Sequence, residues 1–202
     1  ADLHRHLDVL REGWFPGGLT AHRGVRRLLV NHYLDLSTGQ TRRHWPTGPI
    51  AETSDPLGAC RLAAEQTRRT VEALRADGSV AMALTGGNES RFLLAACRPF
   101  AAELDFVTVD GPETRRDVDL SRRLAARFGL RHRTLAVSRA DAAGEALWHA
   151  QTGHCMGGTN MSTHPTVRPL SAVDQFLVGF GGEIGRGFFW CLKDTAATEI
   201  TA

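Results

Sequence analysis

A short apolar segment that leads directly into a glycine-rich loop is the feature that most limits how this chain can fold. Residues 79–84, Ser-Val-Ala-Met-Ala-Leu, are typical of a strand that is covered on both faces of a sheet. The loop that follows is Thr85-Gly86-Gly87-Asn88-Glu89-Ser90. Residues 91–98 then favour a helix that stops at Pro99, because proline cannot continue a helix. This order predicts one unit of a parallel α/β sheet.

The same alternation of strand and helix continues along the chain. Apolar patterns predict further strands at 104–109, 133–137 and 175–180, and helices at 57–76, 117–128 and 140–150. With 202 residues, the chain is long enough to bury the core of such a sheet. We therefore predict a doubly wound parallel α/β sheet. Ligands of these sheets bind beyond the carboxyl ends of the strands, where the glycine-rich residues 85–90 and 181–187 would converge.

The N-terminal part has a different pattern. Residues 28–45 predict a β-hairpin with a turn at 37–40, because a partly alternating apolar segment is followed by turn residues and a polar return. Residues 46–56 contain three prolines together with Gly, Thr and Ser, which is typical of a linker. Residues 151–165 are rich in Gly, Ser and Thr and lack periodicity, so we expect no regular element there.

The residue types of the first loop suit a phosphate group. Glycines let backbone N–H groups approach an anion, and the start of a helix adds further N–H groups and a favourable dipole. Thr85 and Ser90 can donate hydroxyl hydrogen bonds to phosphate oxygens. The Glu89 carboxylate is favourable beside phosphate when Mg²⁺ lies between them. The same residues also fit a tight strand–helix turn capped by Glu89 and Ser90, and the spacing alone does not decide between the two.

Composition argues against several classes of function. The net charge is only +2, and the arginines are scattered as pairs, so we expect a solvated surface and no nucleic-acid partner. No apolar run approaches the ~20 residues that span a bilayer, so we expect no membrane association. The four cysteines have no C-x-x-C spacing, which favours reduced thiols in a cytoplasmic protein. Lys193 is the only lysine, a bias that we attribute to the base composition of a bacterial genome.

The first loop and its flanks resemble a known family. Residues 79–96 are similar to the S-G-G-x-D-S loop of the N-type ATP pyrophosphatases, the PP-loop superfamily with the adenine nucleotide alpha hydrolase-like fold. Within that superfamily, the chain most resembles the asparagine synthetase family. Four further segments carry the resemblance: the hairpin 24–45, the helix that precedes the loop, the strand and helix 106–132 that include Asp117, and the late strand and loop 177–183. The likeness covers most of the chain.

The resemblance implies a site for ATP and Mg²⁺. It implies that residues 85–90 bind the β- and γ-phosphates of ATP, that Gly181 lies near the α-phosphate, and that Leu84, Thr108 and Val109 lie near the adenosine. The family holds Mg²⁺ on the pyrophosphate through one aspartate in each loop. At the matching positions this chain has Glu89 and Glu183, which keep the negative charge, and Thr85 replaces a serine and keeps its hydroxyl.

One arginine follows the second loop. Arg186 could supply positive charge to the transition state of phosphoryl chemistry, and with Glu183 it completes the residues that we predict to be catalytic. An ordinary surface arginine is the alternative interpretation.

The resemblance also implies a domain plan. Residues 1–46 would be the end of a glutaminase-like domain or a hairpin extension, 47–56 a linker, and 57–202 an ATP-pyrophosphatase synthetase-like domain. The chain begins at Ala1 rather than at the family's cysteine nucleophile, and it ends soon after the second loop. We therefore expect a fragment that is incomplete at its C-terminal end. A homo-oligomer, or a partner chain that supplies the missing segments, would complete it.

The activity implied by the resemblance is formation of an amide bond at the expense of ATP. A carboxylate of a small molecule or peptide is activated as an acyl-adenylate with release of pyrophosphate, and an amine or ammonia then displaces AMP. Two alternatives remain at this stage: a degenerate domain that binds a nucleotide or a partner without catalysis, and a tRNA-modifying PP-loop enzyme. The scattered arginines weigh against the tRNA-modifying enzyme.

Overall fold

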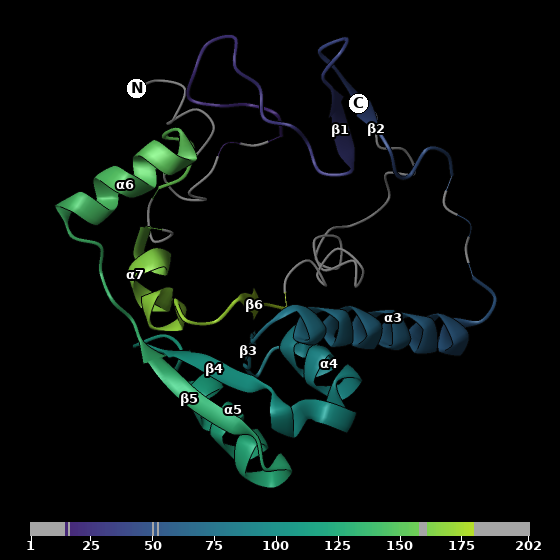
Figure 1. The fold of residues 1–202 in the computed structure, drawn as a ribbon, viewed down its shortest axis with the longest axis vertical. Helices are drawn as coiled ribbons and strands as arrows, with labels where there is room; N and C mark the ends of the chain where they lie inside the picture. Colours follow the sequence, from purple (N-terminus) through teal and green to yellow (C-terminus); the bar gives the residue numbers. More distant parts are fainter. Residues whose placement is uncertain (1–14, 16, 50, 52, 158–160, 180–202) are drawn as a thin grey trace, which may run out of the picture. The chain divides into compact units, whose positions relative to one another are not determined.

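The computed structural model describes residues 15, 17–49, 51, 53–157 and 161–179. They form two compact units (Figure 1). One consists of the described residues within 1–56 and 137–168, and the other of those within 57–136 and 169–202. The predicted division into a glutaminase-like end, a linker and a synthetase-like domain stays a prediction.

The second unit is built on a four-stranded parallel sheet. Its strands are β3 (Val80–Ala83), β4 (Asp105–Asp110), β5 (Arg131–Ala136) and β6 (Gln175–Leu177), in the spatial order β5-β4-β3-β6. Met82 on β3 pairs with Phe106 on β4 and with Leu177 on β6. The chain steps from β3 to β4 to β5 in one direction, whereas β6 lies on the other side of β3. The predicted parallel α/β sheet is confirmed, and its order reverses between β3 and β6.

Three helices and one 3-10 helix accompany the sheet. They are α3 (Pro56–Asp77), α4 (Asn88–Ala96), η1 (Arg98–Glu103) and α5 (Arg115–Phe128), and α5 packs against β4 and β5 (Figure 1). Gly129 caps the C-terminal end of α5 with the left-handed φ of 63° that favours glycine. The predicted stop at Pro99 is corrected: α4 ends at Ala96, and Pro99 lies in the first turn of η1, where its missing N–H costs nothing. Among the described helices, none has the length and apolar character needed to cross a membrane.

The core of this unit lies around β3 and β4. Val80, Ala81 and Met82 are all buried, as expected for a strand covered on both faces. Met82 and Phe106 are completely buried and pack in one cluster with Val71 of α3 and Leu94 of α4. Burial of a side chain of this size stabilises the fold by about 1.5–3 kcal/mol. This cluster therefore fixes the helices against the strand from which the glycine-rich loop begins.

Strand β6 is short and is anchored by a side chain. The carboxylate of Asp174 accepts hydrogen bonds from the backbone N–H of Ser79 at 2.8 Å and from its hydroxyl at 2.7 Å. These bonds, the hydroxyl bond first, lower the pKa of Asp174 below its usual value. The strand ends at Leu177, so the predicted strand 175–180 is too long; residue 180 lies outside the described residues. The anchor places the residues that follow β6 beside those that follow β3.

The first unit contains the predicted hairpin. β1 (His32–Asp35) and β2 (Gln40–Arg43) pair antiparallel, with Gly39 in a left-handed conformation in the turn. The remaining helices are α6 (Ala142–Thr152), α7 (Thr163–Val167) and η3 (Arg168–Leu170). The expectation of no regular element in 151–165 is wrong at both ends, because α6 continues to Thr152 and α7 begins at Thr163.

The buried Cys97 generates a test of the core. Its side chain is fully buried, and burial raises the pKa of the Cys97 thiol to about 11. At pH 8 only about 0.1% of such a thiol is ionised, and the thiolate is the reactive form. We therefore expect iodoacetamide to label the exposed Cys60 rapidly and Cys97 slower by orders of magnitude, as measured by peptide mass spectrometry. In urea both should react. Equal labelling rates in the folded protein would contradict this packing.

Candidate functional site

The loop between β3 and α4 lies at the point where the strand order reverses. Three successive backbone N–H groups of this loop each donate to a side chain of the protein. The N–H of Thr85 donates to Ser90 Oγ at 3.0 Å, that of Gly86 to Asp117 Oδ1 at 2.8 Å, and that of Gly87 to Thr85 Oγ1 at 3.1 Å. These bonds satisfy the backbone donors and hold the loop in one shape.

The two hydroxyls of the loop bond to each other. Ser90 Oγ lies 2.9 Å from Thr85 Oγ1 and also contacts the carbonyl oxygen of Thr85 at 3.1 Å. Ser90 is only 4% exposed, so its hydroxyl lies inside the loop rather than on its surface. The structure therefore brings the predicted residues Thr85 and Ser90 together and gives them a role in closing the loop.

The first turn of α4 is the part of the loop best suited to an anion. The first N–H groups of a helix have no partner within the helix, and Gly87 provides no side-chain cap. The helix dipole adds a favourable field for negative charge at this end. The Asn88 side chain is held by Arg91, whose guanidinium donates a hydrogen bond to Asn88 Oδ1 at 2.7 Å. The geometry fits a phosphate group at the N-terminus of α4.

Asp117 is a residue of this site that sequence reasoning did not select. It lies in the first turn of α5, and its carboxylate accepts the N–H of Gly86. A Cβ added to Gly86 would lie 2.6 Å from Leu120 Cδ1 and 3.1 Å from Asp117 Oδ1. A side chain at position 86 would collide with α5, so the packing of α5 on the loop requires a glycine there. The signal was available: Asp117 follows the second strand, whose carboxyl end lies at the same edge of the sheet as that of the first.

The chain that leaves β6 comes into contact with the same loop. A Cβ added to Gly179 would lie 2.7 Å from Glu89 Cβ and 2.7 Å from the backbone N of Ser90. Only a glycine permits this approach, because any side chain would collide with the first turn of α4. The predicted residues Gly181, Glu183 and Arg186 follow shortly after, outside the described residues.

Of the residues expected near adenosine, Leu84 directly follows β3, and Thr108 and Val109 lie on β4. Leu84 is fully buried and Val109 is half-buried. The Thr108 hydroxyl is also buried, 2.6 Å from the carbonyl oxygen of Leu84 and 2.8 Å from both Ser121 Oγ and His132 Nε2. Contact of these residues with adenosine stays a prediction.

The surroundings of His132 favour its neutral form. Because the Leu84 oxygen can only accept, the Thr108 hydroxyl donates to it, and His132 can then donate from Nε2. Burial, and secondarily the charge of Arg122, lowers the pKa of His132. A neutral imidazole protonated on Nε2 therefore satisfies the geometry.

The metal prediction depends on two glutamates, of which the structure describes one. Glu89 is half-buried at the start of α4, next to the N–H groups that suit phosphate. In the described part of the chain, no three His, Cys, Asp or Glu side chains gather to hold a metal by themselves. A cation at Glu89 would therefore need oxygens from a phosphate or from residues outside the described ranges, and this suits Mg²⁺.

Comparison with known proteins gives the family of this chain. The family model for asparagine synthase matches residues 62–199, which include the first loop, Asp117 and the segment after β6. The chain belongs to the asparagine synthase family. This is an ATP-using family of ligases and amidotransferases. We call the loop at residues 85–90, which lies within the matched range, the PP-loop, after the superfamily loop that it resembles.

The chain was also compared with solved structures and with curated protein sequences. A glutamine-dependent NAD⁺ synthetase from Acinetobacter baumannii, solved in complex with ADP, is similar at 17% sequence identity and a TM-score of 0.43. The match covers 78% of the asparagine synthase-family chain and 31% of the synthetase, so the chain spans less than a third of that protein. No curated protein matches the chain significantly in a sequence comparison.

The close packing of α5 on the PP-loop can be tested by substitution. Gly86→Ala would force Leu120 and Asp117 away from the loop, and overpacking of this kind costs about 1–3 kcal/mol. We expect urea denaturation to show that loss in the free energy of unfolding. Gly48→Ala is the control, since a Cβ at Gly48 meets nothing within 4 Å, and its effect should stay within about 0.5 kcal/mol. Equal effects of the two substitutions would contradict the described packing.

The lowered pKa of His132 predicts how stability depends on pH. The unfolded chain binds a proton at His132 near pH 6.5, before the folded protein does, so protonation favours unfolding as the pH falls. The contribution of His132 is thus fully present above about pH 6.5 and is lost below it. We expect the free energy of unfolding to fall less steeply from pH 7 to pH 5 in His132→Gln than in the native protein. Parallel curves would show that His132 is not held neutral.

Proposed function

We propose that this asparagine synthase-family chain binds ATP at the start of α4 and activates a carboxylate as an acyl-adenylate. One observation carries the proposal. Gly179, directly after β6, lies against Glu89 and Ser90 in the first turn of α4. Two loops thereby meet at the reversal of the strand order, which is where open α/β sheets bind their ligands.

The residues of the PP-loop have separate tasks in this proposal. Backbone N–H groups of the first turn of α4 bind the β- and γ-phosphates, with the helix dipole behind them. Thr85, Ser90 and Asp117 keep the loop in the shape that presents those groups. Glu89, with Glu183, would hold Mg²⁺ on the phosphates, and the ion would neutralise charge on the departing pyrophosphate.

The proposed reaction proceeds in two displacements. A carboxylate oxygen of the substrate attacks the α-phosphorus of ATP, and the bond from the α-phosphorus to the bridging oxygen breaks, so pyrophosphate leaves with the electron pair. An amine or ammonia then attacks the acyl carbon, AMP leaves, and the nitrogen loses a proton to give the amide. Preorganised N–H groups favour the first step because negative charge gathers on the leaving pyrophosphate. Arg186 would add positive charge there.

The proposal also covers the substrate, the nitrogen donor, a partner chain and the cellular location. The substrate is a carboxylate of a small molecule or a peptide, and the donor is an amine or ammonia. A second copy or another chain would complete the acceptor side of the site. The cytoplasm is the proposed location, because Cys60, Cys97 and Cys155 are free thiols.

The proposal is tested by removing one charge. Glu89→Gln keeps the size of the side chain but removes the carboxylate that would face Mg²⁺. We expect calorimetric titration with a non-hydrolysable ATP analogue to show Mg²⁺-dependent binding that this substitution weakens about tenfold or more, the effect of one charge-assisted contact.

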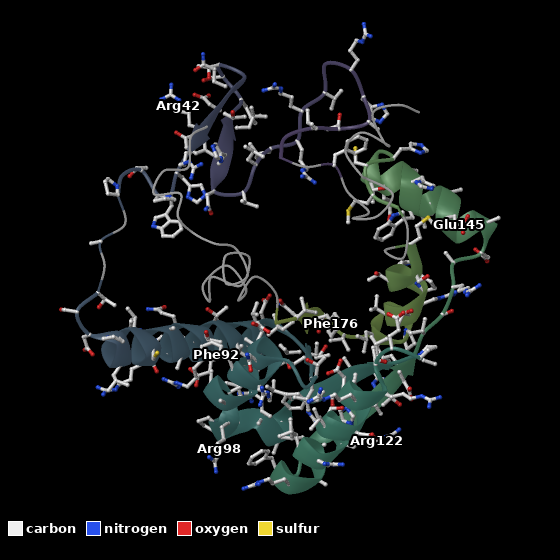
Figure 2. The ribbon with its side chains drawn as sticks, turned by 180° about the vertical axis from the view of Figure 1, so that it is seen from behind. Arg42, Phe92, Arg98, Arg122, Glu145 and Phe176 are labelled. Atoms are coloured by element: carbon white, nitrogen blue, oxygen red, sulfur yellow. The ribbon has the colours of Figure 1, made fainter. Side chains whose placement is uncertain are left out.

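Glu145→Gln provides the matched control. Glu145 also lies in the first turn of a helix, α6, which belongs to the other compact unit, and its side chain is exposed (Figure 2). Its substitution should leave nucleotide binding unchanged. If the folded native protein binds no nucleotide, the degenerate, partner-binding alternative replaces the proposal. Binding of RNA that weakens steeply with salt would favour the tRNA-modifying alternative.

A further inference from the structure

A separate cavity lies between α4, η1 and α5, on the second unit. It has a volume of about 550 Å³, within the range of small-molecule sites. Apolar side chains form much of its lining, with Leu94 from α4 and Leu124 and Phe128 from α5. Three arginines complete it: Arg91, Arg98 and Arg127. We call this cavity the arginine basin.

The arginine basin is positively charged and has no carboxylate in its lining. Within the described residues, no Asp or Glu lies within ion-pair distance of Arg91, Arg98 or Arg127; the ion pairs in this part of the chain involve other arginines. Arginines elsewhere on the same unit do find partners, for example Arg68 with Glu65 and Glu72. Three guanidinium groups around one apolar cavity thus lack an anion among the described residues.

Two of these arginines lie close to the same aromatic ring, that of Phe128. The guanidinium carbons of Arg98 and Arg127 each lie 5.7 Å from the centre of the Phe128 ring, a distance at which cation and ring attract. Phe128 is 41% exposed, so its ring is accessible to a ligand in the basin. Figure 2 shows Arg98 on the outside of this unit, where its charge is accessible to a ligand from solvent.

We propose that the arginine basin binds an amphipathic organic anion: an aromatic or acyl body that carries one carboxylate, sulfonate or phosphate group. The body packs on Leu94, Leu124 and Phe128, and the acidic group binds the guanidinium groups, which match planar oxyanions through paired N–H donors. The basin includes none of the residues assigned to ATP in the proposed function. Its occupancy can therefore be measured whether or not the PP-loop binds a nucleotide.

The test uses two fluorescent probes that share an aromatic body. 1-Anilinonaphthalene-8-sulfonate carries the anion, and N-phenyl-1-naphthylamine is its neutral counterpart. We expect the sulfonate to bind the folded 202-residue chain with a Kd on the order of tens of micromolar, typical of a ligand of this size, and the neutral probe to bind at least several-fold more weakly.

Paired variants separate the basin from the rest of the surface. The double substitution Arg98→Gln with Arg127→Gln should weaken sulfonate binding about tenfold or more and leave the neutral probe unchanged. Arg123→Gln is the control, because Arg123 is an exposed arginine on α5 that does not line the basin. Arg91 is left intact, since it also donates to the carbonyl oxygen of Gly87 at 3.1 Å. Phe128→Ala should weaken both probes.

The proposal is overturned if the double variant binds the sulfonate as tightly as the native chain, or if the neutral probe binds as tightly as the sulfonate. Circular dichroism checks that the double variant is folded. If it is not, salt dependence of the native chain decides. Raising NaCl from 0.05 to 0.5 M shortens the Debye length from about 14 Å to about 4 Å. Weaker sulfonate binding at the higher salt supports the proposal, and constant binding overturns it. Dimer formation that excludes the sulfonate and is lost in the double variant would assign the basin to a second copy instead.

Discussion

Parallel hydrogen bonding between β3 and β6 brings together two segments that lie 95 residues apart in the sequence. The pairing begins where the Asp174 carboxylate accepts both donors of Ser79, and it continues through only three residues of β6. Because the strands are parallel, both carboxyl ends emerge at one edge of the sheet. Gly179 then meets the first turn of α4. Without this pairing, the PP-loop would lack the second segment that makes it a site rather than a turn.

Hydrogen bonds from backbone N–H groups to side chains set the shape of the PP-loop. The N–H groups of residues 85, 86 and 87 are satisfied by Ser90, Asp117 and Thr85, so they set the conformation of the loop. The donors at the start of α4 come next in the chain, where Gly87 provides no side-chain cap. A tight strand–helix turn and the proposed anion site are thus successive parts of one structure. The two interpretations that the spacing of the loop left open are compatible in this geometry.

Much of the sheet could be predicted because its determinants are local. The continuous apolar segment before Thr85 predicts a strand covered on both faces, and Gly129 predicts the end of a helix, since each signal lies within a few residues. The length of β6, the bond from Gly86 to Asp117 and the short helix α7 were not predicted. The Gly86–Asp117 contact depends on residues 31 positions apart, whose proximity follows only from the packing of α5 on β4 and β5. The roles of Gly181, Glu183 and Arg186 stay predictions from the resemblance.

Arg91 of helix α4 contributes both to the PP-loop and to the arginine basin. The first turn of α4 forms the end of the PP-loop, whereas Leu94, two turns later, reaches both the core and the arginine basin. Arg91 lies between them and donates to the Gly87 carbonyl and to Asn88 Oδ1 while it lines the basin. A guanidinium has a fixed set of donors in one plane. The loop uses Nε and one N–H of Nη2, which leaves the other donors of Arg91 for an anion in the basin, so the PP-loop and the proposed basin site share one guanidinium.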